Sequence, residues 1–276
     1  MTLESADLER AGLRLDIGAP QVEGAAATGQ AGAVATITLD RPRRRNAMTP
    51  GMWRGLAGIG RALPPEVRVV VIRGAGQSFS AGIDLRLFGA DGVPGEEPLP
   101  DPRSAGFEAW IADCQAGYTW LRRPDIVSVA AVHGHAIGAG FQLALACDLR
   151  VFAADAKVCL KEPALGLVPD LTGTKPLVDI VGLPRALEMC LTARTVDAEE
   201  ARELRLAELV VPAGELDDAV ADLTAALLAT DAPTARAVKK LLGSAARNTL
   251  EEQSAAERHA QSALQAERLG PLAAAP

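Results

Sequence analysis

An apolar run without a single polar side chain, VVVI at 69–72 inside VRVVVIRG (67–74), constrains the fold most strongly. A strand that lacks apolar/polar alternation is covered on both faces, as in parallel sheets flanked by helices. Further short, mostly apolar segments also have the pattern of strands: AVATITLD (33–40), SVAAVHG (128–134) and DLRVFAA (148–154). The sequence therefore predicts an α/β fold built on a parallel sheet.

The segments between these strands have the length and pattern of helices, so right-handed crossovers are the expected connections. The predicted helices cover 49–62, 106–122, 140–147 and 175–192. Small residues, Gly and Pro predict loops at 19–33 and 89–105.

The pattern changes at about residue 196, beyond which LVVP (209–212) is the only predicted strand. Ala-, Leu-, Glu- and Arg-rich helices are predicted over 197–207, 215–229, 233–246 and 249–268. Such a tail wraps its own core or packs against a neighbouring subunit. We therefore divide the chain into an α/β core, residues 1–195, and a helical subunit-packing region, residues 196–276.

Composition excludes several classes of protein. With 49% hydrophobic and 23% charged residues, the chain is not disordered, and a net charge of −7 with 3% aromatics argues against nucleic-acid binding. Four scattered cysteines and three histidines predict free thiols and no metal site. The acidic N-terminus and the absence of an apolar run of about 20 residues predict a cytoplasmic protein without a membrane span.

Glycine-bearing turns follow two of the predicted strands: FSAGIDL (79–85) and HGHAIGAG (133–140). Two such turns can direct two backbone N–H groups at one oxygen, which is how a developing oxyanion is stabilised. They could also be ordinary turns beside a parallel sheet. Dinucleotide binding is a weaker alternative, because the glycines at 134, 138 and 140 do not follow the G-x-G-x-x-G order.

The two glycine turns, with TLDRPRRRNAM (38–48) and KEPALGLVPDLTGT (161–174), resemble the enoyl-CoA hydratase/isomerase (crotonase) superfamily over roughly residues 33–212. The resemblance implies a ClpP/crotonase-like spiral of ββα units whose C-terminal helices build a homotrimer or a dimer of trimers. It implies an acyl-CoA thioester as substrate. Coenzyme A then enters as part of the substrate, and no metal or redox cofactor is needed.

By motif position, the resemblance assigns the two oxyanion-hole N–H groups to Ile83 and Ala139. It places Arg43 and Arg45 along the pantetheine and nucleotide, and Arg86 near a CoA phosphate, where a forked guanidinium suits phosphate oxygens. The other residues expected to line the substrate are Ala47, Ala81, Gly82, Asp84, Leu85, Gly138 and Leu165.

The family's acid/base positions correspond to Gln142 and Glu162, so one of the two glutamates used by the hydratases is an amide here. Gln142 can hold water or substrate but cannot carry a proton. Asp170 stands where dienoyl-CoA isomerases have an aspartate. One carboxylate, alone or with Asp170, suffices to shift a double bond. We therefore expect an enoyl- or dienoyl-CoA isomerase; the alternatives are an enoyl-CoA hydratase and a catalytically idle acyl-CoA-binding protein.

A second departure from the family lies at the end of the chain. Family members usually finish with a stretch, often containing Phe and Lys, that covers the acyl-CoA of a neighbouring subunit. The segment QAERLGPLAAAP (265–276) contains neither residue.

Overall fold

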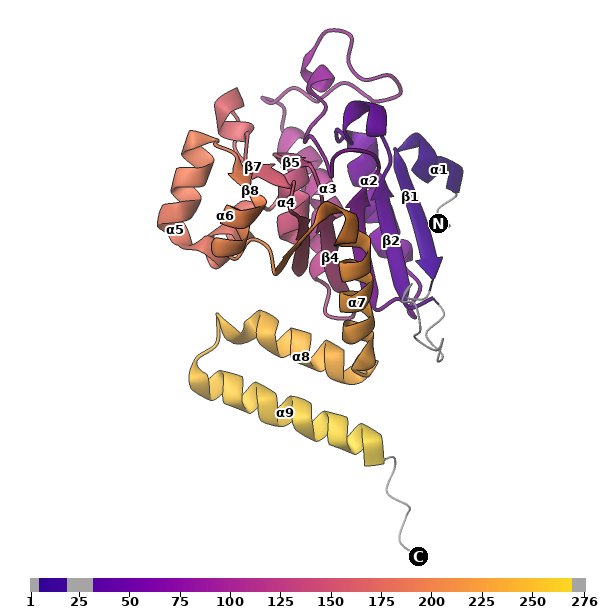
Figure 1. The fold of residues 1–276 in the computed structure, drawn as a ribbon, viewed down its shortest axis with the longest axis vertical. Helices are drawn as coiled ribbons and strands as arrows, with labels where there is room; N and C mark the ends of the chain where they lie inside the picture. Colours follow the sequence, from indigo (N-terminus) through magenta and orange to yellow (C-terminus); the bar gives the residue numbers. More distant parts are fainter. Residues whose placement is uncertain (1–4, 19–31, 270–276) are drawn as a thin grey trace, which may run out of the picture.

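The computed structural model describes residues 5–18 and 32–269 of the chain, and its main sheet has six strands in the order β1-β2-β3-β4-β6-β9. Their bounds are Leu13–Gly18, Val34–Leu39, Val69–Gly74, Val127–Val132, Leu149–Ala153 and Leu209–Val211. β1 is antiparallel to β2, and the remaining neighbours are parallel. The parallel sheet is confirmed, with a strand at each predicted position, LVVP (209–212) included. Strands β1, β2 and β4 of this sheet are labelled in Figure 1.

A second sheet of three short strands lies beside the first. It consists of β5 (His135–Ile137), β7 (Lys157–Cys159) and β8 (Val196–Asp197) in that order. The expectation that LVVP is the only strand beyond residue 196 is wrong, because β8 pairs with β7. Strands of two or three residues are too short to show alternation, so no sequence pattern indicated them.

Helices connect the strands and form the C-terminal part of the described chain. They are α1 (Ser5–Arg10), α2 (Pro50–Ala62), α3 (Phe107–Thr119), α4 (Ala139–Ala146), α5 (Thr174–Thr192), α6 (Ala198–Glu203), α7 (Leu216–Ala229), α8 (Ala232–Ala245) and α9 (Leu250–Leu269). Side-chain caps begin several of them. Thr49, Asp197 and Asp231 each accept a hydrogen bond from a backbone N–H in the first turn of the helix that follows.

Helix α5 is not the single regular helix that the pattern of 175–192 predicts. Gly182 has φ 74° and ψ 161°, and Pro184 follows it inside the same segment. Glycine reaches this backbone conformation without a steric penalty, and proline removes a helix N–H. The segment therefore consists of two helical pieces joined at a kink.

Both faces of β3 are buried, which accounts for its unbroken apolar run. Val70 and Ile72 pack into one hydrophobic core with α2 and α3, whereas Val69 and Val71 pack into a second core under α7. The larger core contains the bulkiest buried side chains. These include Trp53, Tyr118, Phe79, Phe141 and Phe152.

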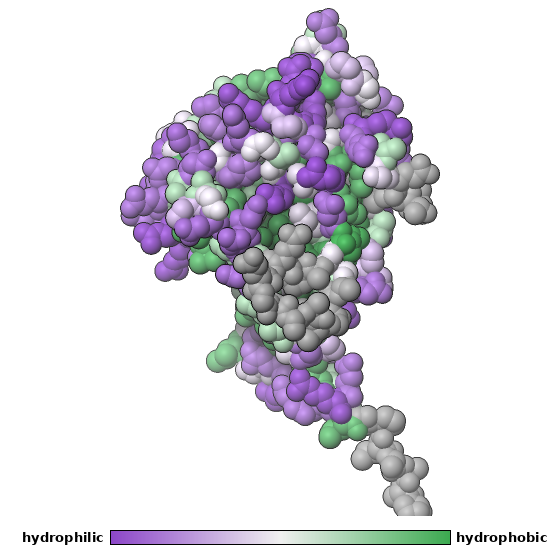
Figure 2. Space-filling view, turned by 45° about the vertical axis from the view of Figure 1, so that its right-hand side comes forward, coloured by the Kyte–Doolittle hydropathy of each residue, from purple (hydrophilic) through white to green (hydrophobic). Residues whose placement is uncertain are grey.

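Helices α8 and α9 form an arm that projects from the main body (Figure 1). Lys239 fastens α8 to the body through the Ile126 carbonyl and the Asp148 carboxylate, each at 2.6 Å. Apolar side chains lie exposed on the surface of the arm (Figure 2), namely those of Val238, Leu242, Leu250 and Leu269.

Strand β9 and helix α7, both beyond residue 195, pair and pack with the main sheet. The division of the chain into two domains at that residue stays a prediction. Of the two predicted loops, 89–105 contains no helix or strand, whereas most of 19–33 lies outside the described residues. No described helix is both long enough and apolar enough to cross a membrane.

Candidate active site

The turn that carries Ile83 lies between two other segments of the chain. On one side it is bonded to residues 45–48, from Ala81 N to Arg45 O (2.8 Å) and from Met48 N to Gly82 O (2.7 Å). On the other side it is bonded to residues 135–137, from Ser80 N to His135 O (2.8 Å) and from Ile137 N to Ser80 O (2.9 Å). The two glycine turns predicted to act together are therefore neighbours.

The approach of the two turns is close at Gly82. A Cβ atom there would lie 2.5 Å from the Ile137 carbonyl oxygen and 3.6 Å from the Ala139 backbone nitrogen. Gly82 also has φ +87°, so only glycine fits without strain. Among the described residues, neither the Ile83 nor the Ala139 N–H has a hydrogen-bond acceptor. Two unused N–H donors thus lie in adjacent turns. Ala139 is the first residue of helix α4, and the helix dipole favours negative charge at that end.

Glu162 is buried against the same turn, with only 8% of its surface exposed. Its Oε1 atom accepts a hydrogen bond from Gln142 Nε2 at 2.7 Å and lies 3.0 Å from where a Gly138 Cβ would be. Its Oε2 atom is buried and has no hydrogen-bond partner within the described part of the chain. Burial raises the pKa of Glu162, and the charge of Asp170 adds to that rise.

Gln142 is fully buried, and both ends of its amide are used. Its Oε1 atom accepts from the backbone N–H groups of Leu171 (2.8 Å) and Gly173 (3.1 Å). This fixes the orientation of the amide, because a flipped amide would direct its NH₂ group at two N–H donors. Gln142 therefore donates to Glu162 and ties that carboxylate to the segment after Asp170.

Asp170 lies near enough for its charge to raise the pKa of Glu162. Burial raises the pKa of Asp170 itself. Its backbone carbonyl accepts a hydrogen bond from Gln115 Nε2 at 2.6 Å, which connects α3 to this segment. The structure thus brings Gln142, Glu162 and Asp170 close together, and their catalytic roles stay a prediction.

Asp84 is buried and paired with two arginines. Arg86 approaches its carboxylate at 3.0 and 2.7 Å, and Arg41 at 3.1 Å. The hydrogen bonds from Arg86, with that from Arg41, lower the pKa of Asp84 to about 2. The Arg86 guanidinium, which we predicted to bind a CoA phosphate, is engaged by this carboxylate.

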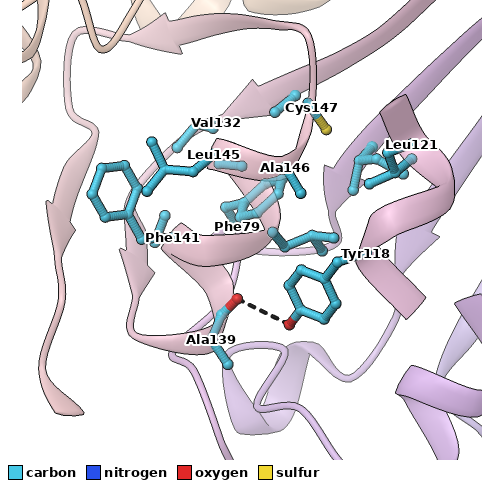
Figure 3. Close-up of a cluster of buried hydrophobic side chains, with 14 of the residues drawn as sticks. Phe79, Tyr118, Leu121, Val132, Ala139, Phe141, Leu145, Ala146 and Cys147 are labelled. Carbon is cyan, nitrogen blue, oxygen red and sulfur yellow. Dashed lines mark hydrogen bonds between the residues drawn. The ribbon is translucent and has the colours of Figure 1, made fainter. Parts of the chain in front are cut away.

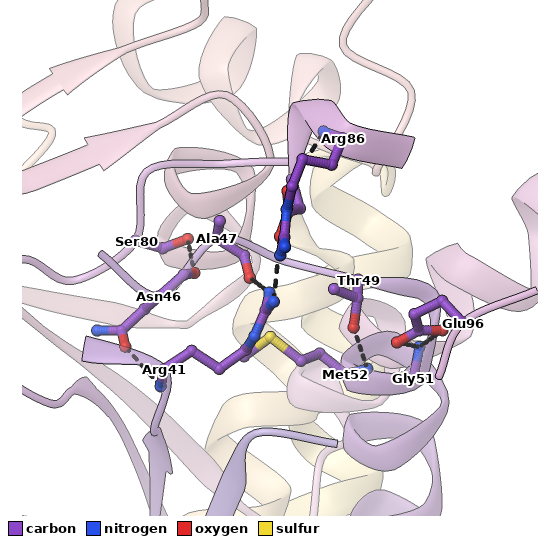
Figure 4. A network of polar contacts seen from close by, with 10 residues as sticks. Arg41, Asn46, Ala47, Thr49, Gly51, Met52, Ser80, Arg86 and Glu96 are labelled. Carbon is purple, nitrogen blue, oxygen red and sulfur yellow. Dashed lines mark hydrogen bonds and ion pairs between the residues drawn. The ribbon is translucent and has the colours of Figure 1, made fainter. Parts of the chain in front are cut away.

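Asn46 is a site residue to which sequence reasoning gave no role. It is fully buried with φ 55°, and its side-chain amide donates to the carbonyls of Ala75 and Ser78, both at 2.8 Å. Its Oδ1 atom accepts from Arg41 N at 2.9 Å (Figure 4). Asn46 thus joins the segment after β2 to the turn after β3. The signal available was the asparagine of the RPRRRNAM turn, since Asn tolerates a left-handed backbone.

Glu96, in the irregular loop at 89–105, caps helix α2. Its two carboxylate oxygens accept from the Gly51 N–H at 3.0 and 2.9 Å (Figure 4). Arg54 Nη2 lies 3.3 Å from its Oε2 atom. An anionic side chain at a helix N-terminus is favourable. This contact fastens the loop beside the site.

Most of the other predicted substrate residues are exposed or partly buried. Leu85 and Leu165 expose 58% and 50% of their surfaces, and Arg43 and Arg45 are exposed as well. Ala47 and Ala81 are partly buried in the turns already described. Contact of any of these residues with a substrate stays a prediction.

Comparison with known proteins gives one consistent family. The sequence profile of "Enoyl-CoA hydratase/isomerase" matches residues 29–270. A carnitinyl-CoA dehydratase of Salmonella enteritidis PT4 is 39% identical over 214 residues, 76% of each chain. A structure from Thermobifida fusca YX, described as an enoyl-CoA hydratase in complex with CoA, superimposes with a TM-score of 0.89 and 55% identity, covering 97% of this chain and 98% of that one.

A second structure of the Thermobifida fusca protein, in complex with acetoacetyl-CoA, matches with a TM-score of 0.89 and 55% identity over 96% of this chain and 98% of that one. These matches confirm the crotonase-like α/β fold that the four sequence motifs indicated. The chain belongs to the enoyl-CoA hydratase/isomerase family.

Proposed function

We propose that this protein shifts a carbon–carbon double bond in an enoyl-CoA or dienoyl-CoA thioester through an enolate intermediate. One observation carries the proposal: a single buried carboxylate oxygen, Glu162 Oε2, is without a partner among the described residues and lies beside two unused backbone N–H donors. A base, and donors for the oxyanion that the base creates, are what this reaction needs.

In this mechanism, the thioester oxygen accepts hydrogen bonds from the Ile83 and Ala139 N–H groups. Glu162 removes a proton from C2 of a 3-enoyl-CoA, and the electron pair of that C–H bond moves toward the thioester oxygen to give a dienolate. The same carboxyl returns the proton to C4, which leaves the double bond between C2 and C3. Each oxyanion donor contributes about 3 kcal/mol to such a transition state, and no metal or redox cofactor takes part.

The raised pKa of Glu162 suits this role, because a base whose pKa approaches the working pH transfers protons in both directions. Gln142 holds Glu162 in place and is itself neutral. Glu162 is therefore the only one of these two side chains that can carry the transferred proton. In a dienoyl-CoA, Asp170 would serve as the second proton carrier.

Coenzyme A as the carrier of the acyl group is supported by the related Thermobifida fusca structures, which are complexes with CoA and acetoacetyl-CoA. The exposed Arg43 and Arg45 would lie along the pantetheine and nucleotide. The exposed apolar residues of the α8–α9 arm support assembly into a trimer or a dimer of trimers.

Addition or removal of water is the second candidate function. The 39% identity to a carnitinyl-CoA dehydratase favours it, whereas the amide at position 142 argues against two-carboxylate chemistry. An idle acyl-CoA-binding protein would keep the two N–H donors and make no use of Glu162.

A spectrophotometric assay with 2-enoyl-, 3-enoyl- and 3,5-dienoyl-CoA separates these functions. Isomerisation creates or shifts the absorbance of the conjugated thioester, water addition removes it, and a binding protein leaves it unchanged. The proposal requires conversion of the 3-enoyl or 3,5-dienoyl substrate. Loss of 2-enoyl absorbance without either conversion would establish hydration instead.

A further inference from the structure

The buried hydroxyl of Tyr118, on α3, contacts Ala139 and Met48 from within the hydrophobic core. Tyr118 has no exposed surface, and its Oη atom is 3.0 Å from the Ala139 carbonyl oxygen (Figure 3). The same atom is 3.1 Å from Trp53 Nε1 and 3.2 Å from the Met48 sulfur. Three helices (α2, α3 and α4) and the segment before α2 therefore meet at one oxygen atom.

The direction of these hydrogen bonds follows from the groups involved. The Trp53 indole can only donate, so the Tyr118 oxygen accepts from it. The hydroxyl has one hydrogen, and a carbonyl oxygen is a better acceptor than a thioether sulfur. The chain of hydrogen bonds therefore runs from Trp53 through Tyr118 to the carbonyl of Ala139. Burial raises the pKa of Tyr118 well above its usual value, so the phenol remains a neutral donor.

Met48 connects this hydroxyl to the other donor turn. The Met48 N–H donates to the Gly82 carbonyl at 2.7 Å, and the Met48 carbonyl accepts from the Asp84 N–H at 2.9 Å. These two bonds hold the backbone immediately before and after Ile83. The Tyr118 hydroxyl thus contacts Ala139 directly and the turn of Ile83 through one intervening residue.

We propose that Tyr118 is the positioning residue that sets the separation of the Ile83 and Ala139 N–H groups, through its contacts with the Ala139 carbonyl and the Met48 sulfur. The inference rests on the proposed function, because that separation matters only if both groups bind one thioester oxygen. Tyr118 itself touches no reacting atom. Its removal changes where the donors point and leaves their number unchanged.

The test is Tyr118→Phe with acetoacetyl-CoA as the probe. This thioester forms an enolate whose near-ultraviolet absorbance reports directly how well the site stabilises charge on the thioester oxygen. We expect Tyr118→Phe to lower the ratio of bound enolate to bound keto form by about 10-fold at fixed pH. We expect kcat to fall by about 10-fold to 100-fold and KM to change by less than about 3-fold, the signature of an interaction specific to the transition state.

Trp120→Phe is the matched control, because it also removes a buried donor, from Trp120 Nε1 to the Gly117 carbonyl at 3.1 Å, without touching either donor turn. It should lower the melting temperature and leave the enolate ratio unchanged. An unchanged enolate ratio in Tyr118→Phe, with enolate present in the native protein, overturns the inference and leaves the proposed function standing. Absence of bound enolate in the native protein overturns both.

Met48→Leu is the second variant, and it decides the matter if Tyr118→Phe does not fold. It removes only the sulfur contact and retains the bond from Tyr118 to Ala139. We expect the enolate ratio and kcat to fall by about 3-fold. If both match the native values, the link from Tyr118 to the Ile83 turn is refuted.

Discussion

Replacing Gln142 with glutamate would place two carboxylates in contact inside the protein. The two oxygens would be 2.7 Å apart, the present distance from Gln142 Nε2 to Glu162 Oε1. At an effective dielectric constant of about 20, two full charges at that separation repel each other by about 6 kcal/mol. The repulsion is scarcely screened, because Gln142 is fully buried and Glu162 is 8% exposed. One of the two carboxyls must therefore retain a proton at neutral pH.

This retained proton has a measurable consequence for stability. Its pKa in the folded variant lies above the value in the unfolded chain, which is about 4.3. The corresponding stability is fully present below that pH and is lost as the pH rises through the folded-state pKa. The slope is about 1.4 kcal/mol per pH unit for one proton. We expect the melting temperature of Gln142→Glu, relative to the native protein, to fall steadily from about pH 5 to about pH 9.

Gln142→Met provides the control, because it removes the hydrogen bond to Glu162 and the acceptor of the Leu171 and Gly173 N–H groups without adding a titratable group. Its loss of stability relative to the native protein should be nearly independent of pH. If the melting temperatures of both variants follow the same pH dependence as that of the native protein between about pH 5 and about pH 9, the contact between Gln142 and Glu162 does not exist as described. Thermal melts followed by circular dichroism in matched buffers suffice for the measurement.

Glu162→Gln should lower kcat by about 1000-fold or more, since it removes the base, while the Kd for an acyl-CoA changes by less than about 3-fold; comparable turnover would exclude Glu162 as the proton carrier. Asp84→Asn should lower the free energy of unfolding by about 2 kcal/mol at pH 7, because the pKa of Asp84 is about 2 in the folded protein and about 3.9 in an unfolded chain. Denaturant titration should show this difference vanish as the pH falls from about 4 towards 2. Glu96→Gln should lower the free energy of unfolding by about 1 kcal/mol, because it weakens the cap on α2. It should also speed proteolytic cleavage within residues 89–105. Identical cleavage rates in the variant and the native protein would show that other contacts hold the loop.

Much of the fold could be predicted because long segments with clear periodicity determine it. The run at 69–72 predicted a doubly covered strand, and Val70 and Val71 indeed pack into opposite cores. The strands of the small sheet could not be predicted, since two or three residues carry no pattern and their pairing depends on turns distant in the sequence. The kink at Gly182 could have been predicted, because glycine and a proline two residues later both interrupt regular helices.

The candidate site shows the same division. The residues that the motifs suggested as acid/base and donor groups lie close together in the structure, and their roles stay a prediction. The contacts of Asn46 and Tyr118 could not be predicted, because each joins segments far apart in the sequence: Asn46 to Ser78, and Tyr118 to Trp53. A buried polar residue finds its partners only in the folded chain, and one sequence does not reveal which residues they are. The isomerase preference rests on the amide at position 142 and awaits the assay.

Position 82 cannot accept a residue other than glycine without moving the backbone. Even a methyl group there would meet the Ile137 carbonyl oxygen at 2.5 Å and push apart the two turns that carry the Ile83 and Ala139 N–H groups. If the proposed function holds, adaptation to longer, shorter or branched acyl groups must therefore come from other segments, such as the irregular stretch between residues 89 and 105. The acyl pocket would then vary while the position of the two backbone donors stays fixed.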